Sequence, residues 1–351
     1  MEAGLHTPDI DHAAARALIA RAVAKAEDLG VRGAVAVVGG SGVLVSASRM
    51  DGGGAGGMAR ARSKAWIAAT QQMPSHEHLR RMSTLPHAME RGFVAVSPEA
   101  VFPGAGGMPI AGADGAIEAG IAASGATMGP FVAYPGAVRE KLIANGKPAN
   151  CEDLLVHYAL EREYAGQHGD DMERWVAAYG EFPADAGEGL GMAEVARAQH
   201  QPELDWAIAL ADRTIEEANA RGVRIAVAIV DHGGDPIQQD WMNGAPTAST
   251  NVAHAIAATA ATFGFPSGQL GDRFSGANAQ LAAAALPFPI LGIEGGLPIP
   301  EASGGASVAS GKSGASGASG ASGDTAFAGG IGVAGPDPAL CAEIAAAAIG
   351  A

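Results

Sequence analysis

The sequence is poor in aromatic residues, basic residues and cysteine. Aromatic side chains make up 5% of the 351 residues, so a core has to be built mainly from small aliphatic side chains. Only 22 lysines and arginines stand against 37 acidic residues, a net charge of −15. This excess argues against nucleic-acid and anionic-membrane partners, which need clustered basic side chains. Cys151 and Cys341 lie far apart and form no CxxC pair, so neither a disulfide framework nor a thiolate metal site is indicated.

Long apolar runs are also missing. No stretch reaches the roughly 18 consecutive apolar residues of a membrane-spanning helix. The N-terminal residues lack the basic segment followed by an apolar segment that is typical of a secretory signal. Together with the unpaired cysteines, these absences predict a soluble, cytoplasmic protein.

Glycine, in contrast, is abundant, with 51 residues, and many glycines recur at fixed spacing because the chain repeats itself. Shifted by 192 places, residues 18–52 align with residues 210–244 without a gap, and 13 of the 35 positions are identical. Each copy begins with a helical pattern that ends at a glycine, Gly30 or Gly222, as expected at a helix C-terminus. A short apolar run follows in each copy and predicts a buried strand.

The repeat continues through three further segments. An Ala-rich helical pattern aligns at an offset of 190, which pairs Lys64 with His254, and GGMPI at 106–110 matches GGLPI at 295–299. Residues 119–126 then match residues 329–336. Between the last two segments the second copy is 21 residues longer. The extra residues fall within the loop 302–323, which is rich in Gly, Ala and Ser, as is typical of a tolerated loop expansion.

These patterns predict three parts. Copy one spans residues 1–138, an acidic helical connector spans 139–200, and copy two spans 201–351 with the loop 302–323. In the connector, His157 and Glu161 lie one helical turn apart and either ligate a metal or, as we expect, lie on a solvated face. His76 and His78 are expected at the surface.

The order of the motifs resembles the GlcG/HbpS family of haem-binding or haem-degrading domains. In copy one the resemblance rests on the segment Arg49-Met50-Asp51-Gly52, Lys64-Ala65, the GGMPI segment and Ser124-Gly125-Ala126. It covers nearly all of residues 12–138 and 203–351. The resemblance implies an α+β, profilin-like fold in each copy, with a central antiparallel sheet flanked by helices, and a tendency to form homo-oligomers. It also makes haem the candidate cofactor.

The positions at which the two copies differ are the candidate site residues. Copy one keeps the Arg, Asp and Lys of the family at Arg49, Asp51 and Lys64, which are expected to bind a ligand or, for Arg49 and Asp51, to pair with each other. Copy two has other polar residues, Asp231, His232, Asn243 and His254.

Each of these residues has an ordinary alternative. His254 is either a hydrogen-bonded helical histidine or a catalytic base or axial haem ligand, and His232 is either a turn residue or a second haem ligand. Asp231 is a candidate for proton transfer, and Asn243 for ligand binding. Lys64 either holds a carboxylate or lies along the surface. The glycine pairs Gly106-Gly107 and Gly295-Gly296 permit close backbone approach or present N–H groups to an anion.

Three functions are compatible with this sequence. The leading hypothesis is a protein that binds haem or another small anionic molecule beside the Ala-rich helix and the GG-x-P-I loop. The alternative is a cofactor-independent lyase or isomerase of a small carboxylate, in which His254 and Asp231 transfer protons. The third is an assembly module that acts through the acidic connector.

Overall fold

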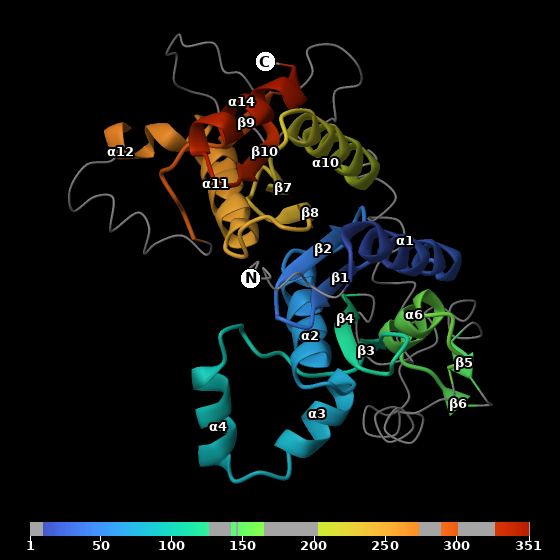
Figure 1. Ribbon diagram of the computed structural model, residues 1–351. Helices are drawn as coiled ribbons and strands as arrows, with labels where there is room; N and C mark the ends of the chain where they lie inside the picture. Colours follow the sequence, from blue (N-terminus) through green and yellow to red (C-terminus); the bar gives the residue numbers. More distant parts are fainter. Residues whose placement is uncertain are drawn as a thin grey trace, which may run out of the picture.

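The computed structural model describes residues 10–125, 142–144, 147–164, 203–273, 289–300 and 327–350 (Figure 1). The loop 302–323 and most of the predicted connector lie outside these residues. Within them, no helix has the length and apolar character needed to cross a membrane.

Copy one begins with a helix and a strand hairpin and continues with helices and a second hairpin. Its elements are α1 (His12–Leu29), β1 (Ala34–Gly39), β2 (Leu44–Arg49), α2 (Gly57–Thr70), α3 (Ser75–Met82), α4 (His87–Val96), β3 (Gly107–Ala111), β4 (Ile117–Ser124), β5 (Ile143–Ala144), β6 (Lys147–Pro148) and α6 (Cys151–Ala159).

Copy two repeats this order. Its elements are α10 (Glu203–Ala220), β7 (Ala226–Asp231), β8 (Pro236–Trp241), α11 (Ser249–Phe263), η2 (Ser267–Gln269), α12 (Leu270–Arg273), β9 (Gly296–Pro300), β10 (Phe327–Ala334) and α14 (Pro338–Ile349). The expected helix ends are confirmed, because Gly30 and Gly222 both have positive φ angles, 72° and 69°.

The two copies share one antiparallel sheet of eight strands, in the order β3-β4-β1-β2-β8-β7-β10-β9. The copies meet where β2 pairs with β8, with Ala47 opposite Gln239, Ser46 opposite Asp240 and Ser48 opposite Gln238. Residues 47 and 239 are themselves equivalent at the repeat offset of 192. The junction therefore has pseudo-twofold symmetry, as in an isologous dimer. The predicted α+β fold is confirmed, with the two expected sheets joined into one.

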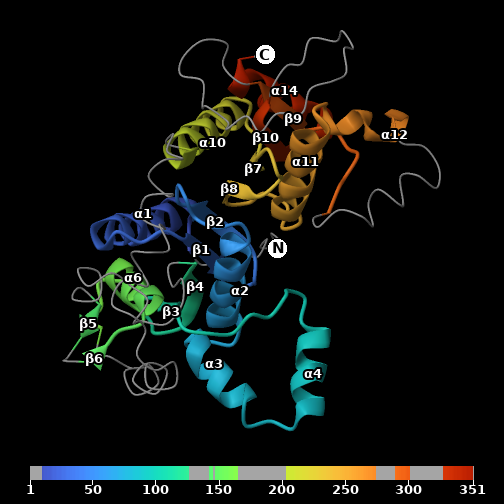
Figure 2. The ribbon, with the colours of Figure 1, turned by 180° about the vertical axis from the view of Figure 1, so that it is seen from behind.

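The helices cover both faces of this sheet. On one face, α1 and α6 pack against strands of copy one, and α10 and α14 against strands of copy two. On the other face, α2 covers β1 to β4 and α11 covers β7 to β10 (Figure 2). Strand side chains alternate between the faces, so that Val35 and Val37 contact the first group while Ala34 and Ala36 contact α2. Helices α3 and α4 extend away from the sheet in both views.

Helix α6 is the counterpart of α14. It packs on α1, β3 and β4 as α14 packs on α10, β9 and β10. Residues 151–159 are expected in the connector on sequence alone, because α6 shares almost no side chains with the Ala-rich α14. We therefore assign α6 to copy one as its last helix.

The outer strands of the sheet carry prolines that limit further pairing. Strand β3 contains Pro109, and β9 contains Pro298 and Pro300. Proline has no N–H to donate, and it is found mainly on edge strands for that reason. The free edges of the sheet are therefore poor templates for another strand, unlike the β2 and β8 edges that join the copies.

The close approach of α2 to β4 depends on a glycine, which gives a test of this packing. A Cβ atom at Gly120 would lie 2.4 Å from the Ala65 carbonyl oxygen and 2.6 Å from the Ala69 nitrogen. We expect Gly120→Ala to lower the free energy of unfolding by about 1–3 kcal/mol, because helix and strand must separate. The matched control is Gly54→Ala, where no heavy atom lies within 4 Å of the new Cβ, and its expected change is within about 0.5 kcal/mol. Equal losses in chemical denaturation would contradict this packing.

Candidate functional site

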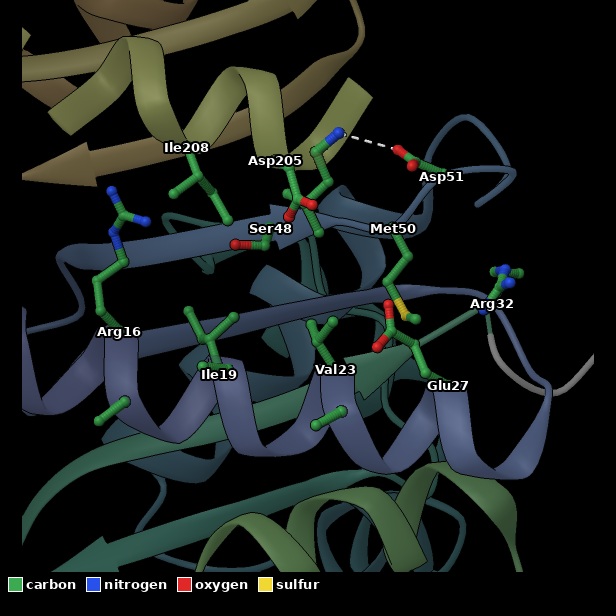
Figure 3. A pocket seen from close by; sticks show the side chains of 14 residues that line it. Arg16, Ile19, Val23, Glu27, Arg32, Ser48, Met50, Asp51, Asp205 and Ile208 are labelled. Atoms are coloured by element: carbon green, nitrogen blue, oxygen red, sulfur yellow. Dashed lines mark hydrogen bonds between the residues drawn. The ribbon is translucent and has the colours of Figure 1, made fainter. Parts of the chain in front are cut away.

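A groove of about 600 Å³ lies between the first helices of the two copies (Figure 3). Helix α1, the loop after it, and the end of β2 with the two residues that follow supply most of its lining, and Leu204, Asp205 and Ile208 of α10 supply the rest. Its volume is within the range of small-molecule sites. The groove lies on the α1 and α10 face of the sheet, whereas the pockets expected from the sequence lie beside the Ala-rich helices on the opposite face.

The groove combines apolar walls with charged ends. Side chains of Ile19, Val23 and Ile208 line its middle, and Arg16 lies at one end, as Figure 3 shows. Its remaining charged and sulfur-containing lining residues are Glu27, Arg32, Met50, Asp51 and Asp205. Apolar walls with a few polar groups are typical of sites that bind organic ligands.

Asp51 and Asn243, both predicted to bind a ligand, each accept a hydrogen bond from the first helix of the other copy. The Leu204 backbone N–H donates to Asp51 Oδ1 at 2.9 Å, and the His12 backbone N–H donates to Asn243 Oδ1 at 3.0 Å. These helix-terminal N–H groups have no partner within their own helix. The two residues are therefore equivalent caps that join the copies, and Asp51 also lines the groove.

Arg49, Asp231 and His254 gather around the turn between β7 and β8. Arg49 donates through a terminal guanidinium nitrogen to Asp231 Oδ2 at 2.6 Å, so it pairs across the junction and not with Asp51. His254 Nε2 lies 3.2 Å from the Gly234 carbonyl oxygen of the same turn. Burial lowers the pKa of His254 despite that hydrogen bond, and the nearby Arg62 charge lowers the pKa further.

His232 lies exposed in this turn, beside the half-buried pair of Arg49 and Asp231. Within the described ranges, no group of three or more His, Cys, Asp or Glu side chains is arranged to hold a metal ion. The structure brings His254 and His232 to one turn, and neither lines the groove.

Lys64, Glu152 and Asp153 form a buried ionic cluster between α2 and α6. Lys64 Nζ donates to Glu152 Oε2 at 2.5 Å, and each of the three residues is at most 6% exposed. The Gly106 N–H donates to Asp153 Oδ1 at 2.7 Å, and the Gly125 N–H donates to Glu152 Oε1 at 2.8 Å. Lys64 and the glycine loop were expected to bind an anion, and in the structure the carboxylates that they bind belong to α6 of the same chain.

The two central helices align at an offset of 192, and the offset of 190 is wrong. A Cβ at Gly107 would lie 2.9 Å from the Lys64 carbonyl oxygen, and one at Gly296 would lie 2.3 Å from the Ile256 carbonyl oxygen. Ile256, and not His254, is therefore the counterpart of Lys64. Two Ala-rich sequences can be aligned at several offsets with similar numbers of matching residues. The alignment made from the sequence alone therefore used the wrong offset.

The glycine that precedes each of these also identifies the counterpart of Glu152. A Cβ at Gly106 would lie 2.6 Å from Glu152 Cβ, and one at Gly295 would lie 3.5 Å from Cys341 Cβ. Cys341 of α14 thus occupies the place that Glu152 occupies in copy one. The predicted close backbone approach at these glycine pairs is confirmed.

Two histidines that were expected to be solvated are buried. His78 and His157 are each 4% exposed, and burial lowers the pKa of both. Their rings lie 5.2 Å from those of Phe93 and Tyr164, respectively. The predicted surface position was wrong for both histidines. Neighbouring segments pack over these side chains, and the spacing of residues along a helix does not reveal that packing.

Sequence reasoning missed the most connected polar residue of the junction, Asp240. His12 Nε2 and Ser46 Oγ each lie 2.8 Å from Asp240 Oδ1, and Arg16 Nε lies 3.0 Å from the same oxygen. Gln238 Nε2 donates to Asp240 Oδ2 at 2.8 Å. Burial alone would raise the pKa of Asp240, but the His12 hydrogen bond and the Arg16 charge hold it below its ordinary value. We call Asp240, His12, Arg16 and Ser46 the Asp240 cluster.

The ionic cluster at Lys64 predicts that substitutions of Lys64 and Glu152 have strongly coupled effects on the free energy of unfolding. Lys64→Ile should lower the free energy of unfolding by about 3–5 kcal/mol, because Glu152 stays buried without its cation. Adding Glu152→Cys reproduces the apolar pair Ile256 and Cys341 of copy two and should recover part of that loss. A double variant whose loss in chemical denaturation equals or exceeds the sum of the two single losses would contradict the coupling.

Asp153 predicts a specific dependence of stability on pH. Burial raises its pKa to about 7 from an ordinary 3.8, against the hydrogen bond from Gly106. The folded chain therefore holds this proton more tightly than the unfolded chain. The resulting stabilisation is complete below about pH 4 and is lost as the pH rises towards 7. The free energy of unfolding of the wild type minus that of Asp153→Asn should decrease as the pH rises from about 4 towards 7. Parallel pH profiles of the two proteins would contradict the raised pKa of Asp153.

Comparison with solved structures finds similar proteins, one of them in complex with haem. Streptomyces reticuli HbpS, as a double mutant, is 25% identical over 43% of this chain and 86% of its own, with a TM-score of 0.32. A PduOC:haem complex is 22% identical over 40% of this chain and 88% of its own, with a TM-score of 0.32. Klebsiella pneumoniae protein ORFY is 18% identical over 42% of this chain and 90% of its own, with a TM-score of 0.33.

Comparison with curated protein sequences gives no match. The family model described as haem degrading protein HbpS-like matches residues 10–129 and residues 203–332, once in each copy. These two regions make up well over half of the sequence, and the chain therefore belongs to the HbpS-like family.

Proposed function

We propose that the protein binds a small, largely apolar molecule that carries carboxylates, in the groove between α1 and α10, and that haem is the ligand to test first. The observation that carries the proposal is the groove itself, with apolar walls drawn from both copies and an arginine at each end. The family and its haem-associated relatives support the choice of haem.

The lining residues fit haem in three respects. A volume of about 600 Å³ is in the range of sites for organic ligands. The aliphatic side chains of Ile19, Val23 and Ile208 suit an apolar macrocycle. Arg32 would hold a propionate, since guanidinium groups pair well with carboxylates, whereas Arg16 at the other end is already bound to Asp212 and Asp240.

Met50 is the lining residue of a type that ligates haem iron, because its thioether is a known axial ligand. Its side chain points into the groove towards Glu27 in Figure 3. Bound haem would supply iron redox chemistry, while the chain would supply the apolar walls, the cations and this sulfur. Glu27 and Asp205 add negative charge at the same end, so Arg32 is the residue that would compensate the charge of a propionate there.

The anionic ligand expected beside Lys64 draws less support from the structure. The donors there already bind Glu152 and Asp153. The enzymatic alternative also draws less support, because Asp231 is paired with Arg49 and His254 is hydrogen-bonded to a backbone carbonyl. We therefore propose the groove as the ligand-binding site.

A titration with haem, followed by visible absorption, tests the proposal. We expect the wild type to shift the Soret band and Ala24→Trp to weaken binding at least tenfold, because the indole would fill the groove that Ala24 lines. The control Ala14→Trp alters an exposed residue of the same helix outside the groove and should bind as the wild type does. Absence of a Soret shift, or equal effects of the two variants, would overturn the proposal.

A further inference from the structure

The junction between the copies has two equivalent sides, and their chemistry differs. On the first side, Leu204 and Ile208 in the first turns of α10 line the groove together with Ser48 of β2. On the second side, His12 and Arg16 in the first turns of α1 contact Asp240 of β8. At the repeat offset of 192, these residues are counterparts, His12 of Leu204, Arg16 of Ile208, and Asp240 of Ser48.

Equivalent residues are hydrogen-bonded to one another on the two sides. Ser46 Oγ donates to Asp240 Oδ1 at 2.8 Å on one side, and Ser48 Oγ donates to Gln238 Oε1 at 2.6 Å on the other. The caps supplied by Asp51 and Asn243 are equivalent in the same way. The difference between the sides therefore comes from side chains and not from a different arrangement of the copies.

The second side is filled by the long side chains of His12 and Arg16, which contact the buried carboxylate of Asp240. Arg16 and His12 both reach Asp240 Oδ1, and Arg16 also donates to Asp212 Oδ1 at 2.5 Å. The Asp240 side chain is fully buried beneath them. On the first side, Leu204 and Ile208 are shorter, and Ser48 offers no charge to draw a cation across. A groove remains open there.

We infer that the divergence of the two copies has turned a symmetric pair of ligand grooves into a single one, so that each chain binds one ligand molecule, with the Asp240 cluster closing the second groove. This inference rests on the proposed function of the groove. The polar residues that differ between the copies then set the number of ligand molecules per chain and join the copies. They do not form two pockets with different chemistry.

The first test compares equivalent positions in the otherwise native chain. Glu216 is the counterpart of Ala24 and is exposed on α10. Titration with haem should give one haem per chain for the wild type and for Glu216→Trp, and at least tenfold weaker binding for Ala24→Trp. Two haem molecules per wild-type chain, or weakening by Glu216→Trp, would overturn the inference and leave the proposed function standing. Haem binding by none of the three proteins would overturn the proposed function itself.

The second test opens the closed side. The triple variant His12→Leu, Arg16→Ile, Asp240→Ser places the residues of the first side at the three equivalent positions of the second side. Arg16 also borders the open groove, but its guanidinium is bound there to Asp212 and Asp240 and not to a ligand. We expect it to bind two haem molecules per chain, and addition of Glu216→Trp should return it to one. A folded triple variant, checked by circular dichroism, that binds one haem molecule would overturn the inference. If the triple variant does not fold, the first test decides alone.

Discussion

The pairing of β2 with β8 is the interaction on which the rest of the structure depends. It joins two four-stranded sheets into one and brings the N-terminus of each first helix into contact with the other copy. The buried carboxylate of Asp240 lies at this junction and is bonded to side chains of both copies. A buried charge that loses its partners is costly, by several kcal/mol in comparable cases. The copies therefore resist separation beyond what strand hydrogen bonds alone provide.

The junction also explains why the polar residues of the two copies differ. Arg49 faces Asp231 across it, whereas the residues at these positions in the opposite copies are Trp241 and Gly39. A copy-one sheet paired with another copy-one sheet would lack the Arg49 partner. The differences favour pairing of unlike copies. They also leave one side of the junction filled and the other side hollow, and the hollow side is where a ligand can enter.

Much of the fold could be predicted from the sequence, because its signals are local. Helix ends at Gly30 and Gly222, the apolar strands and the close approach at Gly107 all follow from residue type and spacing. The junction could not be predicted in this way, since Ser46 and Asp240 are distant in sequence and neither belongs to a recognisable motif. The register of the Ala-rich helices was also undetermined, and the error of two residues exchanged Ile256 for His254 as the counterpart of Lys64. The groove lies on the other face of the sheet from Lys64 and His254, and its lining comes from both copies, which no local motif reveals.

The central claim is that the two copies form one cooperative sheet through β2 and β8. Native-state hydrogen exchange of the backbone amides in these strands tests it most directly, because exchange free energies separate local opening from global unfolding. If the claim holds, the hydrogen-bonded amides around Ala47 and Gln239 exchange with the same free energy as those at the centres of β1 and β7. Exchange of the β2 and β8 amides through a much lower opening free energy, with β1 and β7 still protected, would show that the copies are separate units and would contradict it.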